Sequence, residues 1–391
     1  MSLPDPSLSL PRPPAELLAV SEALCNRIVN KIETVGALPF ADFMTMALYE
    51  PGLGYYVNGL HKFGHAGDFV TAPEQGSLFA QTLASQFDTL AAELGPDWTL
   101  LEIGAGSGVL ARDLLMQLRQ PPARYLILDR SAALRQVQAE QLEGLPQSLK
   151  DRVQWLSAPP QESFSGVILA NEVIDALPVS VFELVDAELF ERAVSVSEQG
   201  FRWTRRAPDK RLAGAVAHLR EALPHPLPKN YSSEICLDLP GWMQTVTEPL
   251  VRGLALFIDY GYPRTEYYHP QRDSGTLVCH YRHRAHFDPF AWPGLTDISA
   301  FVDFSLAAEA GVAAGLELAG FTSQGAFLLA LGAHERVTAA SGDKERMRLA
   351  GELKRLVLPG EMGEKFKVLA LSKALEQPVQ GLEPGSQLHR L

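Results

Sequence analysis

WTLLEIGAGSGVLARDLL, residues 98–115, decides the fold because it predicts a strand, a glycine-rich turn and a helix in direct succession. Residues 98–103 form a short apolar run, as in a central strand that is covered on both faces. Glycines at alternate positions over 104–108 permit backbone angles that a Cβ forbids. Apolar residues then recur at helical spacing over 109–118. Since a helix N-terminus directs unpaired N–H groups outward, we expect a ligand over the turn.

The order of small residues in this turn separates two classes of ligand. A dinucleotide-binding turn needs G-x-G-x-x-G/A, and the last of these positions is Val109 here. The observed pattern is E-x-G-x-G-x-G, with Glu102 near the end of the strand. That carboxylate would repel a pyrophosphate but attract the cationic amino group of S-adenosylmethionine (SAM), directly or through water. The turn therefore favours SAM over NAD, and a purely structural turn is the other alternative.

A second acidic residue lies in register with the glycine turn. RYLILD, residues 124–129, predicts the next strand and ends in Asp129. Doubly wound folds place an acid roughly twenty residues past the glycines, where it accepts hydrogen bonds from ribose hydroxyls. Asp129 is therefore the expected ribose ligand.

Polar residues also follow the strand predicted at 166–171. They are Asn171, Glu172 and Asp175. Open α/β sheets bind ligands beyond the carboxyl ends of their strands, so this cluster should face the cofactor. Two alternatives are that the cluster only caps a helix, or that Glu172 contacts the adenine side of SAM.

A glycine-rich segment at 61–83 precedes the central strand and is expected to fold over the cofactor as a lid. Gly67 and Thr71 are its candidate contacts to the methionine end of SAM.

Strands and helices alternate through most of the chain, which predicts a doubly wound α/β sheet of roughly seven strands with inserted substrate-side elements. Besides those above, strands are expected at 152–156, 254–263, 327–332 and 366–373, and helices at 15–35, 77–94, 131–142 and 343–357. The expected organisation is a flexible arm at 1–14, a helical region with the lid at 15–95, the first half of the core at 96–180, inserted elements at 181–250, the second half of the core with a basic loop at 251–375, and a tail at 376–391.

Composition limits the partners. The formal net charge of −12 over 391 residues leaves no basic excess to neutralise phosphates, so nucleic acid is disfavoured. Three scattered cysteines give neither a disulfide framework nor a zinc spacing, and no metal site is expected. No apolar run is long enough to span a membrane, and the first residues lack the pattern of a signal or transit peptide. We therefore expect a cytoplasmic protein, and the aromatic lid region favours a homodimer.

Eight longer motifs carry a family resemblance: FMTMALYEPGLGYYVNG, GDFVTAPE, LLEIGAGSGVLARDLL, LANEVIDALPV, FIDYGYP, GTLVCHYRHRAH, DPFAWPGLTDISAFVDF and EMGEKFKVLALS. Spread from residue 40 to residue 373, they resemble the MidA-like family of SAM-dependent protein arginine methyltransferases, which includes a mitochondrial complex I assembly factor and its bacterial relatives. The resemblance implies a class I, Rossmann-like, seven-stranded methyltransferase fold with SAM as cofactor. It also implies a protein substrate with an accessible arginine, such as a respiratory complex I subunit or another protein.

The resemblance assigns roles to the site residues. The implied ligands of the amino-acid part of SAM are Glu102, Gly104, Ala105, Gly106 and Gly108, and Asp129 takes the ribose. Carboxylates pair bidentately with the planar guanidinium, so Glu172 and Asp175 are expected to orient it, beside Asn171. Three alternatives stay open: a non-catalytic assembly protein that retains a SAM pocket, a methyltransferase with another substrate, and an oxidoreductase.

Overall fold

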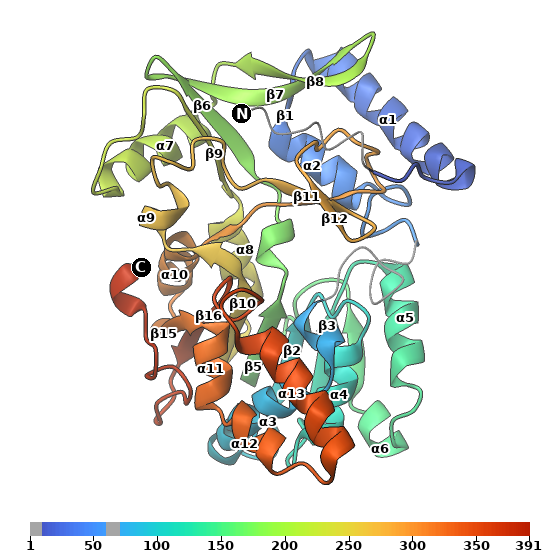
Figure 1. The fold of residues 1–391 in the computed structure, drawn as a ribbon, viewed down its shortest axis with the longest axis vertical. Helices are drawn as coiled ribbons and strands as arrows, with labels where there is room; N and C mark the ends of the chain where they lie inside the picture. The colour runs from blue at the N-terminus through green and yellow to red at the C-terminus, as the bar shows by residue number, and fades with distance from the viewer. Residues whose placement is uncertain (1–9, 60–70) are drawn as a thin grey trace. The chain divides into compact units, whose positions relative to one another are not determined.

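The computed structural model describes residues 10–59 and 71–391 and divides into two compact units. One, here called the sheet unit, consists of Val70–Ile174, Pro240–Pro263 and Val302–Leu391. The other, the meander unit, consists of Met1–Phe69, Asp175–Leu239 and Arg264–Phe301. The chain therefore passes several times between units, and each unit is assembled from segments that are distant in sequence (Figure 1).

A seven-strand path forms the centre of the sheet unit, in the order β15-β16-β10-β5-β2-β3-β4, and a short strand, β14 (Val302–Asp303), also pairs with β10. All path neighbours are parallel except β16, which runs antiparallel to both β10 and β15. The bounds are β2 Thr99–Ile103, β3 Arg124–Leu128, β4 Val153–Leu156, β5 Phe164–Asn171, β10 Leu250–Tyr262, β15 Glu317–Ser323 and β16 Phe366–Lys373. In sequence order the sheet begins at β2 and is extended on one side by β3 and β4. The next strand, β5, pairs with the other side of β2. Open α/β sheets bind ligands at such a point, where the strand order reverses. The predicted class I α/β fold is confirmed.

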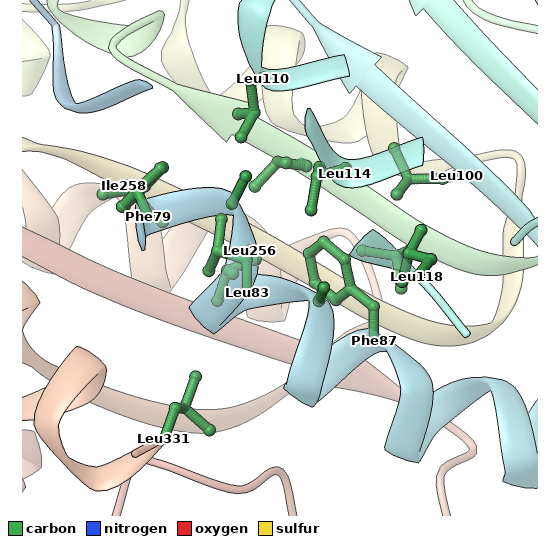
Figure 2. Packing of buried hydrophobic residues seen from close by; sticks show 14 of the residues in the cluster. Phe79, Leu83, Phe87, Leu100, Leu110, Leu114, Leu118, Leu256, Ile258 and Leu331 are labelled. Atoms are coloured by element: carbon green, nitrogen blue, oxygen red, sulfur yellow. The ribbon is translucent and has the colours of Figure 1, made fainter. Parts of the chain in front are cut away.

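The largest hydrophobic core covers one face of this sheet. Residues of α3 (Leu78–Leu94) and α4 (Val109–Gln117) pack on strand residues of β2, β5 and β10. Figure 2 shows Phe79, Leu83 and Phe87 of α3 facing the same cluster as Leu110 and Leu114 of α4. Fully burying a side chain of this size contributes about 1.5–3 kcal/mol, so the cluster fixes the glycine turn between β2 and α4.

The remaining helices of the sheet unit are α5 Ala132–Leu142, α6 Gln147–Lys150, α8 Leu239–Thr247, α10 Phe304–Ala313, α11 Gln324–Ala330, α12 Ala333–Thr338 and α13 Asp343–Val357. Residues of α11 and α13 join the core on the side of α3. On α10, a Cβ at Gly311 would meet Leu371 of β16. The bounds of α13 are those predicted from its charge pattern.

One predicted strand is wrong. Residues 327–332 lie in the helix α11 and the turn after it, and the strand of this region is β15, which ends at Ser323. The Ser323 side chain accepts a hydrogen bond from the Ala326 N–H and so begins the helix. A short run that is apolar throughout has no period that separates a buried helix from a strand.

The meander unit holds a five-stranded and a three-stranded sheet in the described residues. The larger contains β1 Leu38–Pro39, β6 Ser180–Val185, β7 Glu188–Ser197, β8 Gly200–Arg206 and β9 Tyr231–Ile235, and the smaller contains β11 Val278–Tyr281, β12 Arg284–His286 and β13 Asp297–Ser299. Its helices are α1 Ala15–Val35, α2 Phe40–Tyr49, α7 Lys210–Ala222 and α9 Arg264–Tyr267. The helix predicted at 15–35 is confirmed, and the basic loop is the β11–β12 turn of this unit.

Within residues 10–59 and 71–391, no helix is long and apolar enough to cross a membrane, and no three His, Cys, Asp or Glu side chains are grouped so that they could hold a metal ion.

Candidate functional site

The turn between β2 and α4 adopts the left-handed backbone that its glycines permit. Gly104, Gly106 and Gly108 have φ of +64°, +54° and +83°. A Cβ at Gly104 would lie 3.0 Å from Val173, and one at Gly108 would lie 3.0 Å from the Cα of Gln138. Other residues would therefore both strain the turn and push it against its neighbours.

Ala105 completes this turn. Its side chain is buried, and its carbonyl accepts a 2.8 Å hydrogen bond from the Gly108 N–H. This bond closes the loop directly before α4 begins, so the first N–H groups of the helix lie beside the glycines.

Gln138 of α5 connects the turn to the end of β3. Its buried side-chain amide donates to the Gly106 carbonyl (3.1 Å) and to Asp129 Oδ2 (2.9 Å). Its Oε1 accepts a 3.0 Å hydrogen bond from Trp155 Nε1. An indole N–H can only donate, so Trp155 fixes which end of the amide faces the turn. Gln138 thereby holds the two predicted cofactor elements at a set separation.

Asp129 follows β3, and each of its carboxylate oxygens has one donor from the protein. Oδ1 accepts from the Ser131 N–H at 2.8 Å, while Oδ2 accepts from Gln138. Burial raises the pKa of Asp129, and these hydrogen bonds together with the charge of Arg135 oppose the rise. A carboxylate oxygen can accept more than one hydrogen bond, so this pair retains acceptor capacity for a ligand.

Glu102 is the next-to-last residue of β2, near the end of the strand as predicted, and it is only 3 % exposed. The Tyr125 hydroxyl donates to its Oε2 at 2.6 Å. Burial raises the pKa of Glu102 to about 7, although the hydrogen bond from Tyr125 opposes the shift. Near neutral pH this carboxyl group is therefore ionised only in part.

Glu172 directly follows β5 and has a left-handed backbone, with φ +55°. Its N–H donates to the Ile258 carbonyl of β10 at 2.8 Å, which fixes this conformation. Its Oε1 accepts from the Ala72 N–H (3.3 Å) and from Asn171 Nδ2 (3.2 Å). A non-glycine residue in this region costs about 1–3 kcal/mol, and such strain collects at functional sites.

Asp259 of β10 contacts the residues that follow Glu172. Its Oδ2 accepts hydrogen bonds from the Val173 and Ile174 N–H groups, at 3.1 and 2.9 Å. The side chain is 1 % exposed. Asp259 therefore supports the turn that carries Glu172.

Asp175 is the first residue of the meander unit and lies in the short helix Ile174–Ala176. Its carbonyl accepts from the Ala300 N–H, and its side chain is buried. Together with Asp297, its charge raises the pKa of Tyr56 after the larger effect of burial. The two expected guanidinium carboxylates, Glu172 and Asp175, thus belong to different units.

The described part of the predicted lid begins at Thr71, which precedes the short helix Ala72–Gln75; Gly67 lies outside the described residues. The Ser107 hydroxyl donates to Glu74 Oε1, so this segment contacts the glycine turn. Through Ala72 it also contacts Glu172.

Sequence reasoning missed Glu74, Ser107 and Gln138. Ser107 stands inside the glycine motif, so its polarity was a usable signal. Glu74 and Gln138 reach the turn only through tertiary packing, and no local spacing reveals that.

Comparison with known proteins gives a consistent picture. A family model described as "Putative S-adenosyl-L-methionine-dependent methyltransferase" matches residues 78–322. A solved structure from Burkholderia thailandensis with bound S-adenosyl-homocysteine is 40% identical, covers 98% of this chain and 100% of its own, and superposes with a TM-score of 0.91.

Two curated relatives align over nearly the whole chain. The protein arginine methyltransferase NDUFAF7 homolog of Drosophila melanogaster, mitochondrial, is 28% identical, with 94% of this chain and 89% of that protein covered. The mitochondrial protein arginine methyltransferase NDUFAF7 of Mus musculus is 28% identical, with 96% and 88% covered.

Proposed function

The chain belongs to this family of SAM-dependent methyltransferases, and from that premise we propose that it methylates an arginine guanidinium of a protein substrate. The resemblance to MidA-like methyltransferases is confirmed by the family match and by the relatives. The arginine acceptor is supported by the names of these relatives. The observation that carries it is Glu172, a carboxylate that is held on a strained backbone in the same unit as the glycine turn.

The residues of the sheet unit fit SAM as the cofactor. The first N–H groups of α4 lie beside the glycine turn and suit the carboxylate of the amino-acid part, and Asp129 keeps acceptor capacity for the ribose hydroxyls. We propose that Gly104, Ala105, Gly106 and Gly108 hold the amino-acid part and that Asp129 accepts the ribose hydroxyls. Gly67 and Thr71 remain proposed contacts from the lid.

Bound SAM would supply a methyl group on a positively charged sulfur. A guanidinium nitrogen would attack the methyl carbon in line as the carbon–sulfur bond breaks, the sulfur would leave as the neutral thioether S-adenosylhomocysteine, and the nitrogen would give up a proton. The protein's part is to align that nucleophile, because correct positioning lowers the barrier by several kcal/mol. Glu172 pairs with the guanidinium N–H groups, while the Ala72 N–H and the Asn171 amide fix the carboxylate. Asp175, three residues further along the chain, is the proposed second carboxylate.

The test is transfer of isotope-labelled methyl from SAM to arginine-containing peptides, with methylarginine identified by mass spectrometry. We expect the native protein to transfer and Glu172→Gln to lose at least roughly 100-fold in rate, since a neutral amide cannot orient the cation. SAM affinity should stay near normal in that variant. Glu140→Gln, an exposed site on α5, is the matched control.

Unchanged turnover in Glu172→Gln would remove its assignment. Methyl transfer to another residue or to a small molecule would overturn the arginine acceptor but not the cofactor. SAM binding without any transfer would favour the non-catalytic assembly protein.

Two further expectations remain proposals. A homodimer is tested by light scattering on the purified protein, where a monomer mass would contradict it. A cytoplasmic location is tested by fractionating the source cells.

A further inference from the structure

We propose that Glu74 supplies the carboxylate that binds the amino group of the cofactor. This role was expected of Glu102. The inference rests on SAM as the cofactor and does not depend on the arginine acceptor.

The first argument is the contact between Glu74 and the glycine turn. The Ser107 hydroxyl donates to Glu74 Oε1, and Ser107 lies between Gly106 and Gly108. The same hydroxyl accepts from the Val109 N–H at 3.4 Å, at the start of α4. Glu74 is half-buried and therefore remains accessible to a ligand. Its carboxylate stands where the turn would receive the amino-acid part of SAM.

The second argument is that the segment carrying Glu74 is anchored on both sides. On its N-terminal side, the Ala72 N–H donates to Glu172. On its C-terminal side, the Leu78 N–H donates to Glu352 Oε2 at 3.0 Å, and Pro73 restricts the backbone between these anchors. Glu74 is consequently pre-positioned, which lowers the entropy cost of binding a ligand.

The third argument is the chemistry of the amino-acid part, which carries an ammonium and a carboxylate. The carboxylate suits the unpaired N–H groups at the start of α4. The ammonium then needs an anion at the same turn. Glu102 is a poor candidate because it is buried, accepts from Tyr125 and is only partly ionised near neutral pH. Glu74 is the carboxylate that contacts the turn directly.

The experiment compares two ligands by calorimetric titration of the full chain. S-adenosylhomocysteine carries the amino acid, whereas 5′-methylthioadenosine has the nucleoside and the sulfur without it. In Glu74→Gln the remaining Oε1 can still accept from Ser107, so the fold is kept and the charge is lost. We expect affinity for S-adenosylhomocysteine to fall roughly ten- to hundredfold, and affinity for 5′-methylthioadenosine to stay unchanged.

Glu102→Gln is the matched comparison, and it should leave both affinities near those of the native protein. The inference is overturned if Glu74→Gln weakens both ligands equally, since that marks a structural role, or if it weakens neither. It is also overturned if the selective loss appears in Glu102→Gln instead. None of these readouts needs a methyl acceptor, so failure of the arginine proposal remains a separate result.

Discussion

Gln138 uses every hydrogen-bonding atom of its side chain in one arrangement. Its amide nitrogen donates to the Gly106 carbonyl and to Asp129, and its amide oxygen accepts from Trp155. Removing such a buried amide leaves partners unsatisfied, which costs more than one hydrogen bond is worth. The residue therefore couples the geometry of the glycine turn to the protonation of Asp129.

Replacing Gln138 by Leu should shift the pH dependence of cofactor binding to higher pH. The hydrogen bond from Gln138 lowers the pKa of Asp129 against the rise due to burial, so its loss raises that pKa further. The charge of Arg135 still lowers the pKa of Asp129 in the variant, and Glu102 is the acidic group that interacts with Asp129. As pH falls, Asp129 should become protonated sooner in the variant and S-adenosylhomocysteine affinity should drop at a higher pH than in the native protein.

Titrations from pH 5 to pH 8 measure this shift. Gln136→Leu, at an exposed site on the same helix, is the control. If S-adenosylhomocysteine affinity fell at the same pH in the native protein and in Gln138→Leu, the coupling would be contradicted.

Glu102 should make the fold less stable as pH rises. Its pKa is raised from 4.5 to about 7 in the folded state, so the native protein binds more protons than the unfolded chain between these values. The contribution of Glu102 to stability is then fully present below about pH 4.5 and is lost as pH rises through about 7, by at most about 3 kcal/mol. Glu102→Gln should remove this loss and be the more stable protein at pH 8. Denaturant unfolding at several pH values measures it, and equal slopes for the two proteins would refute it.

At the scale of elements, the predictable parts were those with a period or a cap. The charged stripe of α13 follows from sequence alone. The wrong strand at 327–332 lacked both signals. The short helix Ala72–Gln75 was not predicted as a helix because its position depends on contacts with Glu172 and Ser107, which are distant in sequence.

Glu352 connects α13 to the start of α3. Its Oε2 accepts from the Leu78 N–H, and Arg348 pairs with its other oxygen. Glu352→Gln should lower the free energy of unfolding by about 1 kcal/mol, since a cap is weakened and the ion pair is lost. Glu345→Gln, which breaks an exposed pair with the same arginine, should have no measurable effect. Urea denaturation of both variants measures the difference. Equal losses in the free energy of unfolding would show that the buried contact of Glu352 contributes no more than the exposed ion pair.

For the whole molecule, sequence patterns predict six of the seven strands of the sheet path, but neither β15 nor the membership of the two units. The pairing of β16 between β10 and β15 joins segments separated by long stretches of chain, and no local pattern encodes it. The position of the Arg264–Phe301 segment in the meander unit is equally a tertiary property.

Cofactor binding should stabilise the whole chain. A ligand that binds only the folded state adds about 2.7 kcal/mol at a hundred times its Kd. S-adenosylhomocysteine should therefore raise the melting temperature, and NADH should not. An equal shift with NADH would contradict the distinction drawn from Val109.

At position 172 the residue that is best for stability differs from the residue proposed for catalysis, because the backbone there is left-handed. Asparagine or glycine tolerates this conformation better than glutamate does, so selection for heat resistance alone should drift away from glutamate there. Glu172→Asn should then be an inactive protein whose backbone is less strained at this position. A library screened only for survival at high temperature would accumulate such variants, and glutamate would return once methyl transfer was also required.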